Sequence, residues 1–186
     1  MRICLLLAAV GGARARLAQR EREKARLTSV RHHRRLSDSS SFEQLVKRTA
    51  ADAAAYDNFG FSVAIDGNTV VSGAPGCYMS WCPAVSGSVY VLRASDGEEL
   101  AKLTAADAAL GDVFGENVAI DGDTVVVGAR GDNNVTGAAY VFRTTDGWDT
   151  YVEVAKLTAS GGAYEDLFGQ SVAINGTTVV VGASQS

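Results

Sequence analysis

Residues 114–129, FGENVAIDGDTVVVGA, decide the fold, because this stretch occurs three times in the chain. The first copy, FGFSVAIDGNTVVSGA, runs from Phe59 to Ala74, and the third, FGQSVAINGTTVVVGA, runs from Phe168 to Ala183. The Phe that opens each copy stands at 59, 114 and 168, so the spacings are 55 and 54 residues. Lysines outside the stretch keep the same spacings: Lys47, Lys102 and Lys156. The chain is therefore built from a tandem repeat.

Each full repeat predicts four short strands, because four β-rich runs are separated by clusters of Gly, Asp and Asn. In the second copy the runs cover residues 114–120, 124–129, 138–143 and 152–158. Asp121-Gly122 predicts a tight hairpin between the first two strands, since a two-residue turn needs positive φ and this pair tolerates it.

The run Val125-Val126-Val127 does not alternate with polar residues. Both faces of that strand are therefore expected to be buried, with neighbouring sheets as the cover. A four-stranded unit of about 50 residues that hides both faces against its neighbours is typical of a β-propeller blade. The predicted fold is all-β: a partial β-propeller of four-stranded antiparallel blades, with about two and a half repeats.

Phe59-Gly60 followed by Gly73-Ala74-Pro75 resembles the FG-GAP repeat of integrin-α-type β-propellers. The resemblance covers residues 46–186, although the last triplet changes to GAR in the second copy and GAS in the third. It implies an extracellular propeller, usually of about seven blades, that serves adhesion or ligand binding through loops on one end.

The chain divides into three expected parts. Residues 1–15 have the order of a secretory signal peptide, with Arg2, an apolar run and a small-residue site at Ala13 and Ala15; an organellar transit peptide is the alternative. Residues 16–45 form a basic linker that contains serines. Residues 46–186 hold the repeats, with boundaries near 46–100, 101–154 and 155–186, the last incomplete. No apolar run approaches the ~20 residues that cross a bilayer as a helix.

Charge separates the leader from the repeats. Residues 1–45 carry 10 Lys+Arg and 4 Asp+Glu, whereas residues 46–186 carry 7 and 17, within a net charge of -4. An acidic surface repels phosphate backbones, so the repeats are not expected to bind nucleic acid.

The calcium cage of the resembling family needs carboxylates at alternate positions ahead of a Gly. This sequence has Asp66-Gly67-Asn68, Asp121-Gly122-Asp123 and Asn175-Gly176-Thr177 instead. Two oxygens in a two-residue hairpin do not supply the roughly six to eight ligands that calcium takes, so no cofactor or metal is expected. Asp57, Asp112 and Asp166, just ahead of each Phe-Gly, either add an oxygen or serve as turn residues.

Candidate binding features lie in the connections. The first repeat has an insertion whose Cys77 and Cys82 would form a disulfide in a secreted protein and hold Tyr78 and Trp81 outward as a binding loop; the alternative is a rigid surface loop. Further candidates are two glycosylation acceptors and an integrin-binding tripeptide in an expected exposed loop: Asn134 and Asn175, and Arg130, Gly131 and Asp132.

Catalysis finds little support, because the repeats contain no His and therefore no Ser/His or Cys/His pair. The expected function is a secreted or cell-surface, non-catalytic binding or adhesion module for a protein or glycan ligand. The alternative is a fragment of a larger propeller-containing enzyme. The final strand, Thr178 to Ala183, lacks a partner on one side, and an unpaired edge invites association. Further blades are therefore expected, favoured in a longer chain over other copies, with a partly folded chain as the third possibility.

Overall fold

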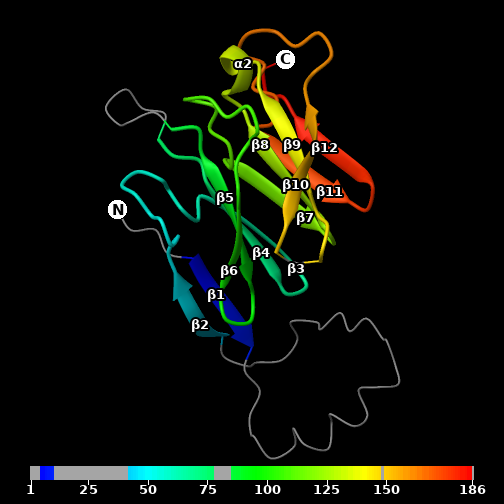
Figure 1. Cartoon of the computed structure of the whole chain (residues 1–186). Helices are drawn as coiled ribbons and strands as arrows, with labels where there is room; N and C mark the ends of the chain where they lie inside the picture. Colours follow the sequence, from blue (N-terminus) through cyan, green and yellow to red (C-terminus); the bar gives the residue numbers. More distant parts are fainter. Residues whose placement is uncertain (1–4, 11–41, 78–84, 148, 186) are drawn as a thin grey trace, which may run out of the picture.

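The computed structural model describes residues 5–10, 42–77, 85–147 and 149–185, and they form an all-β partial propeller (Figure 1). The strands of the first complete blade, blade I, are β3 (Ser62–Asp66), β4 (Thr69–Ala74), β5 (Ser88–Arg93) and β6 (Glu99–Leu103). Those of blade II are β7 (Asn117–Asp121), β8 (Thr124–Ala129), β9 (Ala138–Thr144) and β10 (Tyr151–Leu157). Each blade is an antiparallel meander in chain order, as predicted.

A third unit holds the paired strands β11 (Ser171–Asn175) and β12 (Thr178–Gly182), which repeat the first two strands of a blade. The first strands of successive units lie side by side, since β3 contacts β7 and β7 contacts β11. They therefore form the inner side of the array. A short helix, α2 (Asp132–Val135), lies in the connection from β8 to β9.

Ahead of blade I, β1 (Leu5–Val10) pairs with β2 (Phe42–Arg48) in a two-stranded sheet. Leu7 pairs with Val46 and the register then shifts, just as Val91 of β5 pairs with Ala101 of β6 ahead of a shift. The β1–β2 ladder therefore repeats the third and fourth strands of a blade. The predicted boundary between linker and repeats at residue 46 falls inside β2, so strand structure begins four residues earlier than the sequence suggested.

Burial follows the predicted pattern. Val125, Val126 and Val127 of β8 are each 0% exposed, because blade I covers one face and the third unit the other. The first strand of blade II starts at Asn117 rather than at Phe114, since Gly115 has φ 92° and the Phe-Gly pair forms a turn. The β7–β8 loop consists of Gly122 and Asp123, with the positive φ at Gly122, so the predicted turn is shifted by one residue.

The molecule has two unlike ends. At the hairpin end lie the tight turns within blades, such as β3–β4 and β7–β8. At the loop end lie the β4–β5 and β8–β9 connections, α2, and the segments that link successive units (Figure 1). Within the described residues, no helix is long and apolar enough to span a bilayer.

Candidate functional site at the loop end

An Asp–Tyr–Lys cluster joins blade I to the strand ahead of it. Asp52 follows β2, and its carboxylate accepts a hydrogen bond from the Tyr90 hydroxyl at 2.7 Å and one from Lys102 Nζ at 2.5 Å. The Lys102 ammonium also lies 5.2 Å from the centroid of the Tyr90 ring, within the range of a cation–π contact. One carboxylate thus fixes the third and fourth strands of the blade that follows it.

The same cluster recurs one repeat later. Asp107 follows β6 and accepts from the Tyr140 hydroxyl at 2.8 Å and from Lys156 Nζ at 2.6 Å. Blade II adds a second carboxylate, because Asp132 also accepts from Tyr140 at 2.5 Å and from Lys156 at 2.8 Å. Each cluster lies at the loop end and spans two blades, so it holds one blade against the next.

These contacts shift the ionisation of their members. Hydrogen bonds from Lys102 and Lys156 lower the pKa of Asp52 and Asp107, respectively. Burial, with the hydrogen bond to Asp52, raises the pKa of Tyr90 to about 12. Burial likewise raises the pKa of Tyr140 well above its ordinary value. At neutral pH each cluster therefore contains an ionised carboxylate, a neutral phenol and an ammonium.

The Phe of each Phe-Gly pair supports the cluster from the core. The Phe59 ring meets the Tyr90 ring edge to face with centroids 5.3 Å apart, and Phe114 meets Tyr140 at 5.5 Å in the same way. The repeat motif therefore orients the tyrosines that carry the polar contacts.

A shallow acidic pocket of about 260 Å³ opens beside the blade II cluster. Asp112 and Asp132 are 5% and 4% exposed, and burial, with the nearby charge of Asp132, raises the pKa of Asp112. Oδ1 of Asp132 is buried without a hydrogen-bond partner among the described residues. Blade I has Cys77 at the position of Asp132, so the repeats differ in charge here. The lining residues are Asp107, Ala109, Asp112, Asp132, Asn133, Lys156 and Thr158.

The tripeptide Arg130-Gly131-Asp132 is not offered to solvent in the way that the sequence suggested. Asp132 is 4% exposed and is held by Tyr140 and Lys156, while Arg130 makes an ion pair with Glu116. The expectation of an exposed loop is therefore wrong at Asp132. The physical reason is that a carboxylate next to a buried phenol and an ammonium gains more by bonding inward than by facing water.

The aspartates ahead of each Phe-Gly are turn residues. Asp57, Asp112 and Asp166 accept from the backbone N–H three residues earlier, at 2.6, 2.7 and 2.6 Å. Asp66 and Asp121 in the hairpins bond to the next unit, because they accept from the N–H of Gly122 at 2.7 Å and of Gly176 at 2.5 Å. In the described ranges no three His, Cys, Asp or Glu side chains are placed to hold one metal ion.

The remaining candidates are at the loop end or on the surface. Cys77 is disulfide-bonded, and its partner lies outside the described residues, as do Tyr78, Trp81 and Cys82. The pairing and the aromatic binding loop therefore stay predictions. Asn134 and Asn175 are exposed, so both acceptor side chains are accessible, although no glycan is shown.

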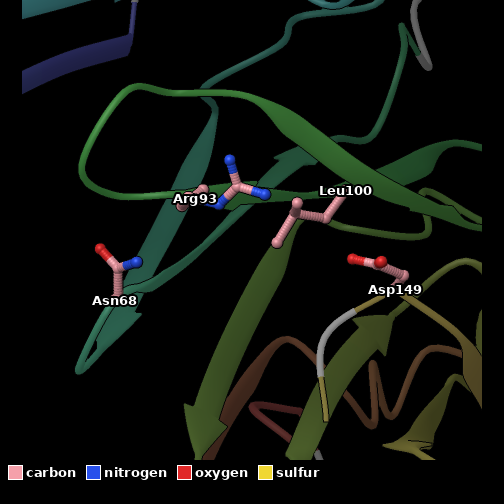
Figure 2. A pocket seen from close by; sticks show the side chains of 4 residues that line it. All are labelled: Asn68, Arg93, Leu100 and Asp149. Carbon is pink, nitrogen blue, oxygen red and sulfur yellow. The ribbon is translucent and has the colours of Figure 1, made fainter. Parts of the chain in front are cut away.

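A second hollow, of about 270 Å³, lies at the hairpin end between blade I and the β9–β10 turn (Figure 2). Its lining residues come from both blades: Asn68, Arg93, Leu100 and Asp149. Arg93 is already paired with Asp96 and Glu98, so the hollow offers no free charge from this guanidinium.

The model of the FG-GAP repeat matches residues 42–92, 93–142 and 151–186. The chain belongs to the FG-GAP repeat family. FG-GAP repeats are found in integrin-like adhesion and binding propellers, typically of extracellular proteins, which agrees with the predicted fold class.

No curated protein matches this chain. Among solved structures, the chain is similar to one titled "Crystal structure of the computationally designed Ika4 protein", at 16% identity and a TM-score of 0.34. The likeness covers 77% of this chain and 94% of that chain.

Sequence reasoning missed the two Asp–Tyr–Lys clusters. The signal was present: Asp52 and Asp107 are 55 residues apart, as are Lys47 and Lys102. The tyrosines are only 50 residues apart, because the insertion after Cys77 shifts the register, and this difference hid their equivalence.

Proposed function

We propose that the chain is a secreted or cell-surface, non-catalytic binding module whose loop end contacts a protein or glycan ligand. The supporting observation is where the repeats differ. The cores, hairpins and clusters recur, whereas the non-repeated residues gather at the loop end: the insertion at 77–84 in blade I, and α2 with Asp132 in blade II. A constant frame with variable loops on one end is the arrangement that binding proteins use.

The test exchanges the variable loop. Residues 77–84 are replaced by Asp-Asn-Asn, the residues that occupy the corresponding place in blade II. Wild-type chain and variant are applied to a glycan array and to immobilised collagen, fibronectin and laminin. We expect the wild type to bind a subset of these probes and the variant to lose that binding, with an unchanged circular dichroism spectrum. Equal binding by both proteins would contradict the role of the loop.

Export is part of the proposal and is tested separately. Mass spectrometry of secreted chain should show an N-terminus near Arg16, a bridge between Cys77 and Cys82, and glycans on Asn134 or Asn175. Retention in the cytosol with free thiols would exclude the extracellular assignment. A catalytic domain in adjoining sequence would favour the alternative, a propeller-containing enzyme.

A further inference from the structure

Blade I exposes an apolar face that blade II covers at the equivalent positions. Val63 and Ile65 on β3 are 56% and 62% exposed, and Phe61 beside them is 52% exposed. Their counterparts in blade II are Val118, which is 7% exposed, and Ile120, which packs on the core. Val118 and Ile120 are covered because blade I lies against them. The face of Phe61, Val63 and Ile65 is the front face of blade I.

The third unit exposes an apolar face of the opposite kind. Val180 on β12 is 61% exposed, whereas its counterparts Val71 in blade I and Val126 in blade II are both 0% exposed. In blade I the residues Val71 and Ala64 belong to the core shared with blade II. Ala173 corresponds to Ala64, so Ala173 and Val180 form the back face of the third unit.

The two open faces match the faces that already pack together. Between blades I and II, Ala64 and Val71 share a core with Val118 and Ile120. The open faces present the same residue types: Ala173 and Val180 on one, Val63 and Ile65 on the other. The back face of the third unit therefore has the shape and chemistry that the front face of blade I requires.

The backbone around Gly182 is ready for the same close approach. A Cβ on Gly73 would stand 1.9 Å from the carbonyl oxygen of Gly115, and one on Gly128 would stand 1.9 Å from that of Gly169. A Cβ on Gly182 would meet no backbone closer than 3.8 Å, because the described residues place no following unit there. By equivalence, Gly182 is the contact point for the carbonyl oxygen of Gly60.

The place in front of blade I is already half filled, and this decides the occupant. Asp52 after β2 bonds Tyr90 and Lys102, just as Asp107 after β6 bonds Tyr140 and Lys156. The β1–β2 pair thus stands where the outer two strands of a preceding blade belong. A complete blade does not fit beside it, whereas the third unit consists of the inner two strands alone.

We infer that two copies of this chain assemble head to tail, with the back face of the third unit of each copy on the front face of blade I of the other. Each copy then contributes two complete blades and half of each of two shared blades. Two copies close a ring of six blades, within the range of four to eight that propellers adopt.

The test measures oligomeric state on the purified full-length chain by light scattering across a range of concentrations. Wild type is expected to be a dimer. Ile65→Asp and Val180→Asp place a carboxylate on the front face and the back face, and each should raise the dimer dissociation constant on the order of 100-fold, because the charge would be buried without a partner. Leu110→Asp is the matched control: Leu110 is 77% exposed outside both faces, and this variant should remain dimeric.

Mixing the two variants distinguishes head-to-tail assembly from loss of folding. Ile65→Asp retains an intact back face and Val180→Asp an intact front face, so an equimolar mixture should form a 1:1 complex that neither forms alone. A monomeric wild type, dimers that persist in both variants, an open polymer, or a mixture that stays monomeric would each overturn the inference.

Discussion

The backbone N–H of Gly115 donates to the carbonyl oxygen of Gly128 at 3.0 Å, and this bond joins the two halves of the repeat motif. The same bond occurs from Gly60 to Gly73 and from Gly169 to Gly182, also at 3.0 Å. The Phe-Gly turn is thereby tied to the end of the second strand, where the next unit makes its closest approach. The fixed separation of the two halves in the sequence follows from this geometry.

Gly128→Ala should destabilise the fold by about 2–3 kcal/mol, because the new Cβ would overlap the carbonyl oxygen of Gly169. Gly182→Ala is the matched control, since its Cβ would meet mainly the rotatable Ser171 hydroxyl, and it should cost under about 1 kcal/mol. Urea denaturation at low protein concentration measures both. Equal costs would show that the approach between units does not set the requirement for Gly.

Asp107→Asn should remove about 0.5–1 kcal/mol of stability at pH 7, a modest amount because the side chain is 53% exposed. The bond from Lys156 lowers the folded-state pKa of Asp107 below its unfolded value. The stabilisation is therefore complete above the unfolded pKa of about 4, and it is lost as pH falls through the folded pKa. Melting temperatures from pH 2 to 7 should converge at the acid end. A constant difference would exclude this linkage.

Asp112→Asn should have the opposite sign. Burial raises the folded-state pKa of Asp112, so the folded protein pays for its charge at neutral pH. Asn keeps an oxygen for the Ala109 N–H, and we expect a gain of up to about 1 kcal/mol at pH 7. This gain should vanish as pH falls below about 4, where both folded and unfolded wild-type chains are protonated. Guanidinium unfolding at pH 7 and pH 3 tests it, and a loss at pH 7 would contradict it.

Glu165→Gly should stabilise the protein by about 0.5–1 kcal/mol. Glu165 has φ 72°, in the left-handed region, and the corresponding residue of the second repeat is Gly111 with φ 91°. The reverse change, Gly111→Glu, should cost about 1 kcal/mol through backbone strain alone, because nothing lies within 4 Å of the added Cβ. Thermal unfolding of both variants provides the comparison. Changes of the same sign would refute the explanation.

Calcium should leave the melting temperature nearly unchanged relative to chelator. Asp66 and Asp121 accept backbone hydrogen bonds from the next unit, so their carboxylates already have partners in the fold. A site specific to the folded state would raise the melting temperature by mass action. A rise of several degrees in differential scanning fluorimetry with calcium would show that the chain holds the ion.

The sequence predicted the blades well, because strand positions follow from local patterns. The second strand, Thr124–Ala129, has the predicted bounds, and Gly115 and Asp123 account for the shifts at the first strand and its turn. Contacts between units were not predictable from local patterns. Asp107 and Tyr140 are 33 residues apart, and only the curvature of the array brings them together. The burial of Asp132 depends on the same contact.

The match to the family model is out of phase with the blades, and this has a consequence for how such chains grow. The segment 42–92 begins with β2, an outer strand, and ends within β5, a third strand. A gene duplication of that segment would insert an outer strand that completes the blade before it and three strands that begin the next. Because Asp52 travels with the duplicated segment, every new copy would arrive with the carboxylate that fastens it to its successor. Such an array lengthens by recombination without redesign of the junction.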